Sequence, residues 1–151
     1  MSLEQQVADG IKKAMLAREE ATLRTLRDIK SAILLAKTSE GFTGEISPAD
    51  EMKMLQKMVK QRKDSLEIYE KQGRADLAAR EKEEIAVIEG FLPKQMTEAE
   101  IREAVKAVIA KTGASSMADM GRVMGVINKE LAGKADGKTI ATLVKEALNS
   151  I

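Results

Sequence analysis

Apolar residues recur three or four positions apart along most of this 151-residue chain, and no segment alternates apolar and polar residues as a strand does. Glycine and proline separate the resulting stripes. The stripes are Leu3, Val7, Ile11, Met15; Leu23, Leu26, Ile29, Ile33, Leu34; Met52, Leu55, Val59, Leu66, Tyr69; Ile101, Val105, Val108, Ile109; Met120, Val123, Met124, Ile127, Leu131; and Ile140, Leu143, Val144, Leu148. The spacing predicts an all-α protein, with four longer helices followed by three short ones.

Local signals predict where several of these helices begin and end. Ser47 followed by Pro48 is typical of a helix start, and Gly73 is placed to end the same helix. The segment 97–100 has the capping-box pattern, and Gly113 is placed to end the helix that it opens. Helix starts and stops are therefore set by residues close to each end.

A boundary between two domains is predicted at Gly-Phe-Leu-Pro-Lys-Gln, residues 90–95. Pro93 disfavours helix at the residue before it, and the charge-dense composition thins after it. We expect an N-terminal bundle of about four helices over residues 1–92 and a small three-helix domain over residues 96–151. In the second domain, Ser116 and Asp136 are expected to cap the last two helices, with Gly133 ending the first of these.

The chain contains no cysteine and no histidine. This excludes disulfides, thiol nucleophiles, Ser-His and Cys-His catalysis and the usual zinc sites. Adjacent carboxylates such as Glu83–Glu84 and Glu19–Glu20 point to different helix faces and do not form an acid–base pair. We therefore expect no catalytic residue, no metal and no cofactor. No signal peptide or membrane-length apolar run is visible, and we expect a cytoplasmic protein without a membrane partner.

Two glycines, Gly121 and Gly125, lie four positions apart inside one of the predicted helices. A glycine inside a helix costs about 1 kcal/mol relative to alanine. Two of them on one face therefore indicate that another body approaches the backbone there. That body is either a second helix, as for other pairs of small residues at this spacing, or a ligand.

Basic residues accompany the two glycines, namely Arg122, Lys129, Lys134 and Lys138, and Gly133 lies among them. Bare backbone beside positive charge is suited to the phosphate backbone of a nucleic acid. The net charge of +1 does not by itself identify a nucleic-acid-binding protein. The residues leave two interpretations open, close helix packing and phosphate binding.

Arg62 interrupts the apolar stripe of the third predicted helix. If the turn at Gly73 folds this helix antiparallel to the next one, Arg62 lies opposite Glu84, with Glu81 about one turn away. A charge on a packing stripe is rarely left unpaired, because its desolvation costs several kcal/mol. We predict a structural ion pair between Arg62 and Glu84, and a charged functional site between the helices is the alternative.

A second basic stripe, Lys53, Lys57 and Lys60, lies on the third predicted helix. Three lysines on one face create a local positive field that suits phosphates. Acidic residues share the same helix, however, and favour a solvated face instead. Arg24 on the second predicted helix is similarly ambiguous.

Five ordered segments carry a resemblance to a known family. They are Lys60-Gln-Arg-Lys-Asp-Ser-Leu-Glu-Ile-Tyr-Glu, Gly73-Arg-Ala-Asp-Leu-Ala, Phe91-Leu-Pro-Lys-Gln, Asp119-Met-Gly-Arg-Val-Met-Gly and Gly133-Lys-Ala-Asp-Gly-Lys. Together they resemble the YqeY family of small bacterial proteins over essentially the whole chain. The resemblance implies an N-terminal helical domain followed by a three-helix tail domain.

Residues 96–151 also resemble the tail domain of GatB, a component of the glutamine-dependent aspartyl/glutamyl-tRNA amidotransferase. That small helical domain is implicated in gripping tRNA away from the active site. The resemblance implies a tRNA-facing segment containing Gly121, Arg122, Gly125, Lys129, Gly133, Lys134 and Lys138. Neither the kinase-like portion nor the amidase portion of that enzyme matches this chain, so a carbon–nitrogen ligase activity would be inherited from the shared tail alone.

We therefore expect a non-catalytic helical module that binds tRNA or another RNA through the tail-like domain. The alternative is a protein-interaction adaptor that docks on a synthetase or an amidotransferase, or an accessory of the glutamine-dependent amidotransferase. In that case the two glycines of the tail would pack a helix of the partner. Phosphate contacts make binding fall steeply with salt, whereas apolar docking is nearly independent of salt.

Overall fold

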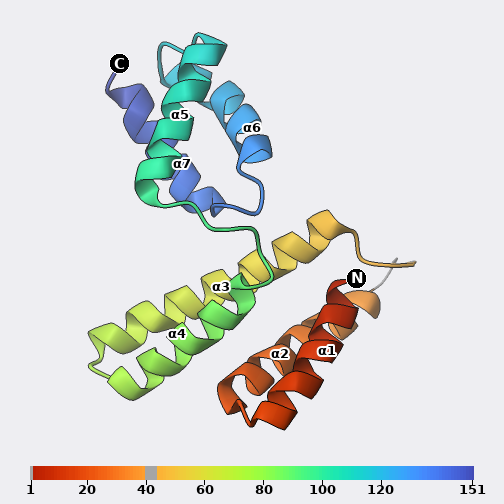
Figure 1. The fold of residues 1–151 in the computed structure, drawn as a ribbon. Helices are drawn as coiled ribbons and strands as arrows, with labels where there is room; N and C mark the ends of the chain where they lie inside the picture. Colours follow the sequence, from red (N-terminus) through yellow and green to blue (C-terminus); the bar gives the residue numbers. More distant parts are fainter. Residues whose placement is uncertain (1, 40–43) are drawn as a thin grey trace. The chain divides into compact units, whose positions relative to one another are not determined.

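The computed structural model describes residues 2–39 and 44–151, and over these ranges the chain has seven α-helices, one 3₁₀ turn and no strand (Figure 1). The prediction of an all-α fold is confirmed. None of the helices in these ranges is long and apolar enough to span a membrane. The chain divides into two compact units, Met1–Leu92 and Pro93–Ile151. Each unit is described by itself.

The first unit is built from two helical hairpins, α1 (Leu3–Ala17) with α2 (Glu20–Lys37) and α3 (Pro48–Lys71) with α4 (Ala75–Glu89). Helix α2 also packs against α4, which joins the two hairpins (Figure 1). The core between them is formed by Leu3, Val7, Ala14, Leu26, Ile29, Ile33, Leu55, Met58, Val59, Ile85, Ile88 and Leu92. Most of these residues belong to the apolar stripes of the sequence, because one face of each helix must be buried to hold the unit together.

The ends of α3 form as their local signals predict. The Ser47 hydroxyl accepts a hydrogen bond from the backbone N–H of Asp50, and Pro48 occupies the first turn. Gly73 follows the helix with φ of +70°, a left-handed conformation that glycine adopts without strain. The stripes overstate the core at two positions, because Met15 and Leu34 are 55% and 49% exposed.

The second unit contains α5 (Glu98–Thr112), the 3₁₀ turn η1 (Met117–Asp119), α6 (Met120–Glu130) and α7 (Gly137–Asn149). The three α-helices pack pairwise against one another (Figure 1). Their shared core contains Ile101, Val105, Val108, Ala114, Val123, Ile127, Leu131, Ala135, Ile140, Leu143, Val144 and Leu148. The inward face predicted for the last helix is thus confirmed at all four of its positions.

The caps of the second unit agree with the sequence at α5 and α7. Thr97 and Glu100 form both hydrogen bonds of a capping box, and Gly113 ends α5 with φ of +70°. Asp136 accepts a hydrogen bond of 2.8 Å from the backbone N–H of Thr139 at the start of α7. Local side-chain to backbone bonds therefore define these ends, as the sequence predicts.

The prediction for α6 is inaccurate at both ends. Ser116 caps the 3₁₀ turn η1 rather than α6 itself, and α6 ends at Glu130 rather than at Gly133. The buried Leu131 turns inward, and the N–H of Lys134 closes a turn onto its carbonyl at 2.9 Å. Gly133 provides the positive φ of that turn, +77°. Gly133 therefore lies in the turn that follows α6 and is not the residue at which the helix ends.

Candidate functional site

One face of α6 carries most of the residues that the sequence singles out. At about 100° per residue, Gly121, Arg122, Gly125 and Lys129 fall within an arc of about 100°. All are exposed. Val123 and Ile127 face the opposite way and are fully buried. The helix thus presents its glycines and their basic neighbours on the side that faces away from the core.

Gly121 and Gly125 are not required for packing inside the unit. A Cβ atom built at either position would meet no atom within 4 Å. By contrast, a Cβ at Gly10 would lie 3.0 Å from Cδ1 of Leu26. Such a short distance is expected where a glycine allows two helices to pack closely. The interpretation that the pair packs a helix of the same unit is therefore wrong, and a body from outside the unit remains.

The side chains of three lysines near this face form no ion pair within the second unit. Lys129, Lys134 and Lys138 are exposed and belong to none of the ion pairs formed within residues 93–151. Fixing a long lysine side chain costs entropy, and here no carboxylate of the unit holds these side chains in place. They are available to a ligand.

Arg122 differs from these lysines. Its Nη2 lies 3.1 Å from Oδ1 of Asp119, and the other oxygen of Asp119 accepts a hydrogen bond of 2.9 Å from the backbone N–H of Ser115. The N–H groups of Ser115 and Ser116 and the guanidinium of Arg122 lower the pKa of Asp119, although its desolvation opposes this. The side chain of Arg122 is therefore partly held by its ion pair with Asp119 at the start of α6.

The turn after α6 is held by the segment that opens the unit. The side-chain amide of Gln95 donates to the carbonyl of Gly133 at 2.8 Å, and the N–H of Met96 donates to the carbonyl of Lys134 at 2.9 Å. Gly133 is thus a structural residue of the turn. The contacts bring the exposed Lys94 near this turn. The sequence analysis did not include Lys94 among the basic residues of this surface, because it used the segment 90–95 only to predict a domain boundary.

A second charged region lies inside the first unit, around the predicted pair. Nη2 of Arg62 is 3.9 Å from Oε1 of Glu84 and 3.0 Å from Oδ2 of Asp28. Nε of Arg24 is 3.7 Å from the same oxygen of Glu84. Glu84 therefore interacts with two arginines. Helix α2 contributes Arg24 and Asp28 to the cluster, and nothing in the sequence predicts that these two residues lie beside Arg62 and Glu84.

This cluster is buried but loosely bonded. The side chains of Glu84 and Arg62 are 8% and 15% exposed, yet separations of 3.7–3.9 Å exceed hydrogen-bond length. Nε and Nη2 of Arg24 and Nε of Arg62 are buried and have no hydrogen-bond partner among the described residues. Buried donors without acceptors are costly. Charge attraction, rather than a complete hydrogen-bond network, holds the cluster together.

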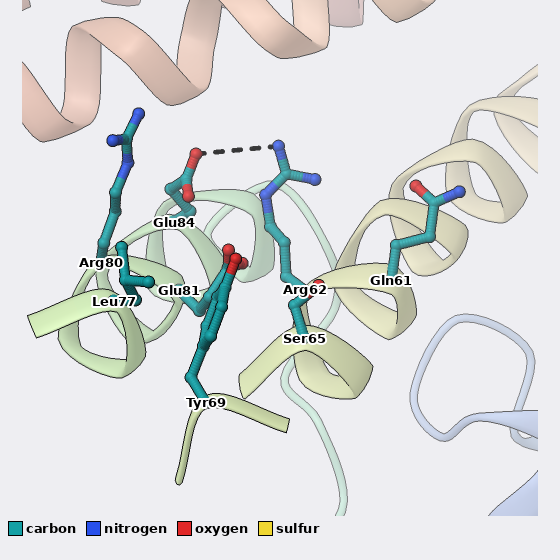
Figure 2. A pocket seen from close by; sticks show the side chains of 8 residues that line it. All are labelled: Gln61, Arg62, Ser65, Tyr69, Leu77, Arg80, Glu81 and Glu84. Atoms are coloured by element: carbon teal, nitrogen blue, oxygen red, sulfur yellow. Dashed lines mark ion pairs between the residues drawn. The ribbon is translucent and has the colours of Figure 1, made fainter. Parts of the chain in front are cut away.

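A pocket of about 370 Å³ opens beside this cluster, between α3 and α4. Figure 2 shows side chains from both helices around it, among them Arg62, Ser65 and Tyr69 of α3 and Arg80, Glu81 and Glu84 of α4. Burial and the nearby charge of Glu84 raise the pKa of Glu81, while three arginines partly offset the shift. Within residues 2–39 and 44–151, no three acidic side chains converge as a metal site would require.

Comparison with known proteins identifies the family. The family described as Yqey-like protein matches residues 4–148, so the chain belongs to the YqeY family. Proteins called "Altered inheritance of mitochondria protein 41, mitochondrial" are similar to it. The one from Clavispora lusitaniae is 34% identical over 126 residues, covering 81% of this chain and 72% of the relative. The one from Pyrenophora tritici-repentis is 27% identical over 146 residues, covering 93% and 77%. The fungal relatives carry a mitochondrial name, so the expected cytoplasmic location and bacterial character stay predictions.

Proposed function

We propose that this member of the YqeY family is a non-catalytic RNA-binding module that holds tRNA through its second unit. The observation that carries the proposal is the exposed face of α6. There Gly121 and Gly125 leave the backbone open, and Lys129 lies on the same face, outside the ion pairs formed within residues 93–151. Lys134 and Lys138 extend the positive charge along the turn and the first residues of α7.

The chemistry of this face suits a phosphate backbone. An absent Cβ lets a bulky chain approach the helix backbone closely, and lysines supply mobile point charges for phosphate oxygens. Neutralising phosphates releases counterions, so binding weakens as salt rises. The scarcity of aromatic residues, 2% of the chain, argues against base stacking as the source of affinity. The face would therefore read backbone shape and charge rather than base sequence.

The choice of tRNA rests on the resemblance of residues 96–151 to the amidotransferase tail domain. The proposal includes a cytoplasmic location, with mitochondria as the alternative suggested by the names of the fungal relatives. It includes neither a cofactor nor a metal. The chain's own contribution is binding, and any chemistry on the RNA belongs to a partner enzyme.

The test is fluorescence anisotropy of the full chain with labelled tRNA, from low to physiological salt. The triple variant Lys129→Glu, Lys134→Glu, Lys138→Glu should lose at least about tenfold in affinity, because three phosphate contacts become repulsive. The matched control is Lys53→Glu, Lys57→Glu, Lys60→Glu on α3. Those lysines are also exposed, they belong to none of the ion pairs among the described residues of the first unit, and the net charge changes equally.

The proposal requires that the control keep near-normal affinity and that both variants keep the wild-type circular dichroism. Equal losses in the two variants would mean that only overall charge matters. Unchanged affinity in the α6–α7 variant would reject the assigned face.

A protein-interaction adaptor is the second candidate, because an open pair of glycines four positions apart also accepts a partner helix. The partner would be a synthetase or an amidotransferase, with this chain as its accessory. Gly121→Leu with Gly125→Leu should then abolish complex formation in size-exclusion chromatography, while raising the salt concentration should leave it intact. The lysine variant above should have little effect on such a complex.

A further inference from the structure

The pocket between α3 and α4 has the size and the polar lining of a small-molecule site. Its volume of about 370 Å³ lies in the range of about 300–1,000 Å³ that such sites occupy. It lies wholly within the first unit and shares no residue with the face assigned to RNA. Nothing in the proposed RNA binding uses it.

Several polar groups around the pocket have no hydrogen-bond or ion-pair partner in the described part of the chain. Arg80 and Glu81 belong to none of the ion pairs formed there, and the hydroxyls of Ser65 and Tyr69 make no hydrogen bond. Figure 2 shows Tyr69 of α3 and Glu81 of α4 pointing into the space between the helices. The pocket therefore offers both unpaired donors and an unpaired carboxylate.

The charges around the pocket balance. Arg62 and Arg80 contribute two positive charges, and Glu81 and Glu84 contribute two negative ones. A ligand with a net charge would leave one sign in excess beside Arg62 and Glu84, whose side chains are 15% and 8% exposed. A ligand with one charge of each sign would preserve the balance. Burial and the charge of Glu84 raise the pKa of Glu81, so a cationic group beside it would be favourable.

We propose that this pocket binds a small zwitterion of α-amino-acid chemistry. The ligand's ammonium group lies beside the carboxylate of Glu81, and its carboxylate faces the guanidinium of Arg80. The hydroxyls of Ser65 and Tyr69 supply hydrogen bonds from the α3 side. Arg62 and Glu84 stay paired with each other and form the charged wall of the site.

The protein contains a reporter for this site. Tyr69 is its one tyrosine, and it has no tryptophan, so tyrosine emission of the full chain comes from a wall of the pocket. Titration with the non-aromatic amino acids, one at a time, should change this emission in a saturable manner for at least one of them. Isothermal titration calorimetry of the same samples detects binding that leaves the emission unchanged.

Variants and single-charge probes decide whether the site recognises both charges. Glu81→Gln and Arg80→Gln should each weaken binding of the responding amino acid at least tenfold. The matched controls, Glu83→Gln and Lys82→Gln on the same helix but outside the pocket lining, should bind as the wild type does. Acetate, inorganic phosphate and methylammonium should bind at least tenfold more weakly than that amino acid.

Three results would overturn the proposal. One is the absence of saturable binding by both emission and calorimetry for every amino acid tested. Another is binding of acetate, phosphate or methylammonium as tight as that of the amino acid, which would indicate a site for one charge. The third is equal weakening by the control substitutions. None of these results bears on tRNA binding by the second unit, which is measured separately.

Discussion

In the first unit, Arg62 and Arg24 lie beside carboxylates at the helix interface. In the second unit, Lys129, Lys134 and Lys138 are exposed and belong to none of the ion pairs formed within residues 93–151. The interface pairs Arg62 and Arg24 with Asp28 and Glu84. The difference separates two uses of positive charge. Arg62 and Arg24 are held by carboxylates of the fold, whereas the three lysines of the second unit remain available to a ligand.

The helices contain two kinds of glycine. Gly73 and Gly113 end α3 and α5 with a positive φ, and Gly10 lies close to Leu26. Gly121 and Gly125 have neither a positive φ nor a close neighbour among the described residues. Glycine lowers the stability of a helix relative to alanine. At these two positions, neither the backbone conformation nor a packing contact within the unit requires glycine. This supports an external role for the face of α6.

The largest effect should come from the buried carboxylate of the first unit. Glu84→Ala should lower the free energy of unfolding by about 2–3 kcal/mol, because Arg62 and Arg24 lose a shared counter-charge. The loss is below that of a fully buried pair, since Arg24 is 31% exposed and Asp28 still pairs with Arg62. Urea unfolding followed by circular dichroism measures it.

The control is Glu83→Ala, whose carboxylate is 58% exposed and 3.9 Å from Arg24. Its effect should stay below about 0.5 kcal/mol, as for other surface pairs. Equal losses for the two variants would mean that the buried cluster adds no more stability than a surface pair, and the contrast between the units would fail.

Substitution of glycine by alanine should act with opposite signs at Gly125 and at Gly73. Gly125→Ala should raise the free energy of unfolding by about 0.5–1 kcal/mol, because its Cβ meets nothing and helix propensity improves. Gly73→Ala should lower it by about 1 kcal/mol, because φ is +70° there. Thermal and urea unfolding of both variants compare the signs directly. A destabilising Gly125→Ala would reveal a packing contact for the α6 face and undermine its external role.

The smallest effect concerns pH and again differs between the units. The folded-state pKa of Glu81 is raised by burial and by the charge of Glu84. The native state therefore binds more protons than the unfolded chain between the ordinary and the raised value, and stability falls as pH rises through that window. Glu81→Gln should be more stable than the wild type at pH 7, by less than about 0.5 kcal/mol because solvent screens the carboxylate, and the gain should vanish below the ordinary pKa of glutamate.

Asp119 of the second unit should behave in the opposite way. Its folded-state pKa is lowered chiefly by the N–H of Ser115. It therefore contributes stability above the ordinary pKa of aspartate, and this contribution is lost as pH falls through the lowered value. Asp119→Asn should be less stable than the wild type at pH 7, with the difference shrinking on acidification. Unfolding titrations of both variants across this range test the contrast, which fails if the two differences run in the same direction.

Sequence reasoning succeeded where the signal is local. The caps at Ser47, Thr97 and Asp136 and the stop at Gly113 each depend on residues within four positions along the chain. It was inaccurate at α6, which ends at Glu130 and not at Gly133. Arg62 and Glu84 could be placed opposite each other from the turn between their helices, and they lie 3.9 Å apart.

The sequence by itself determined that the chain is all-α and where most of its helices begin and end, because helical periodicity and caps act over a single turn. Only the tertiary structure decided that α2 supplies Arg24 and Asp28 to the buried cluster and that a pocket lined by Tyr69 and Glu81 lies beside it. It also decided that no neighbour covers Gly121 and Gly125. These features depend on which helix faces meet across the unit, and that choice is made by the packing of distant apolar stripes rather than by any neighbouring residue.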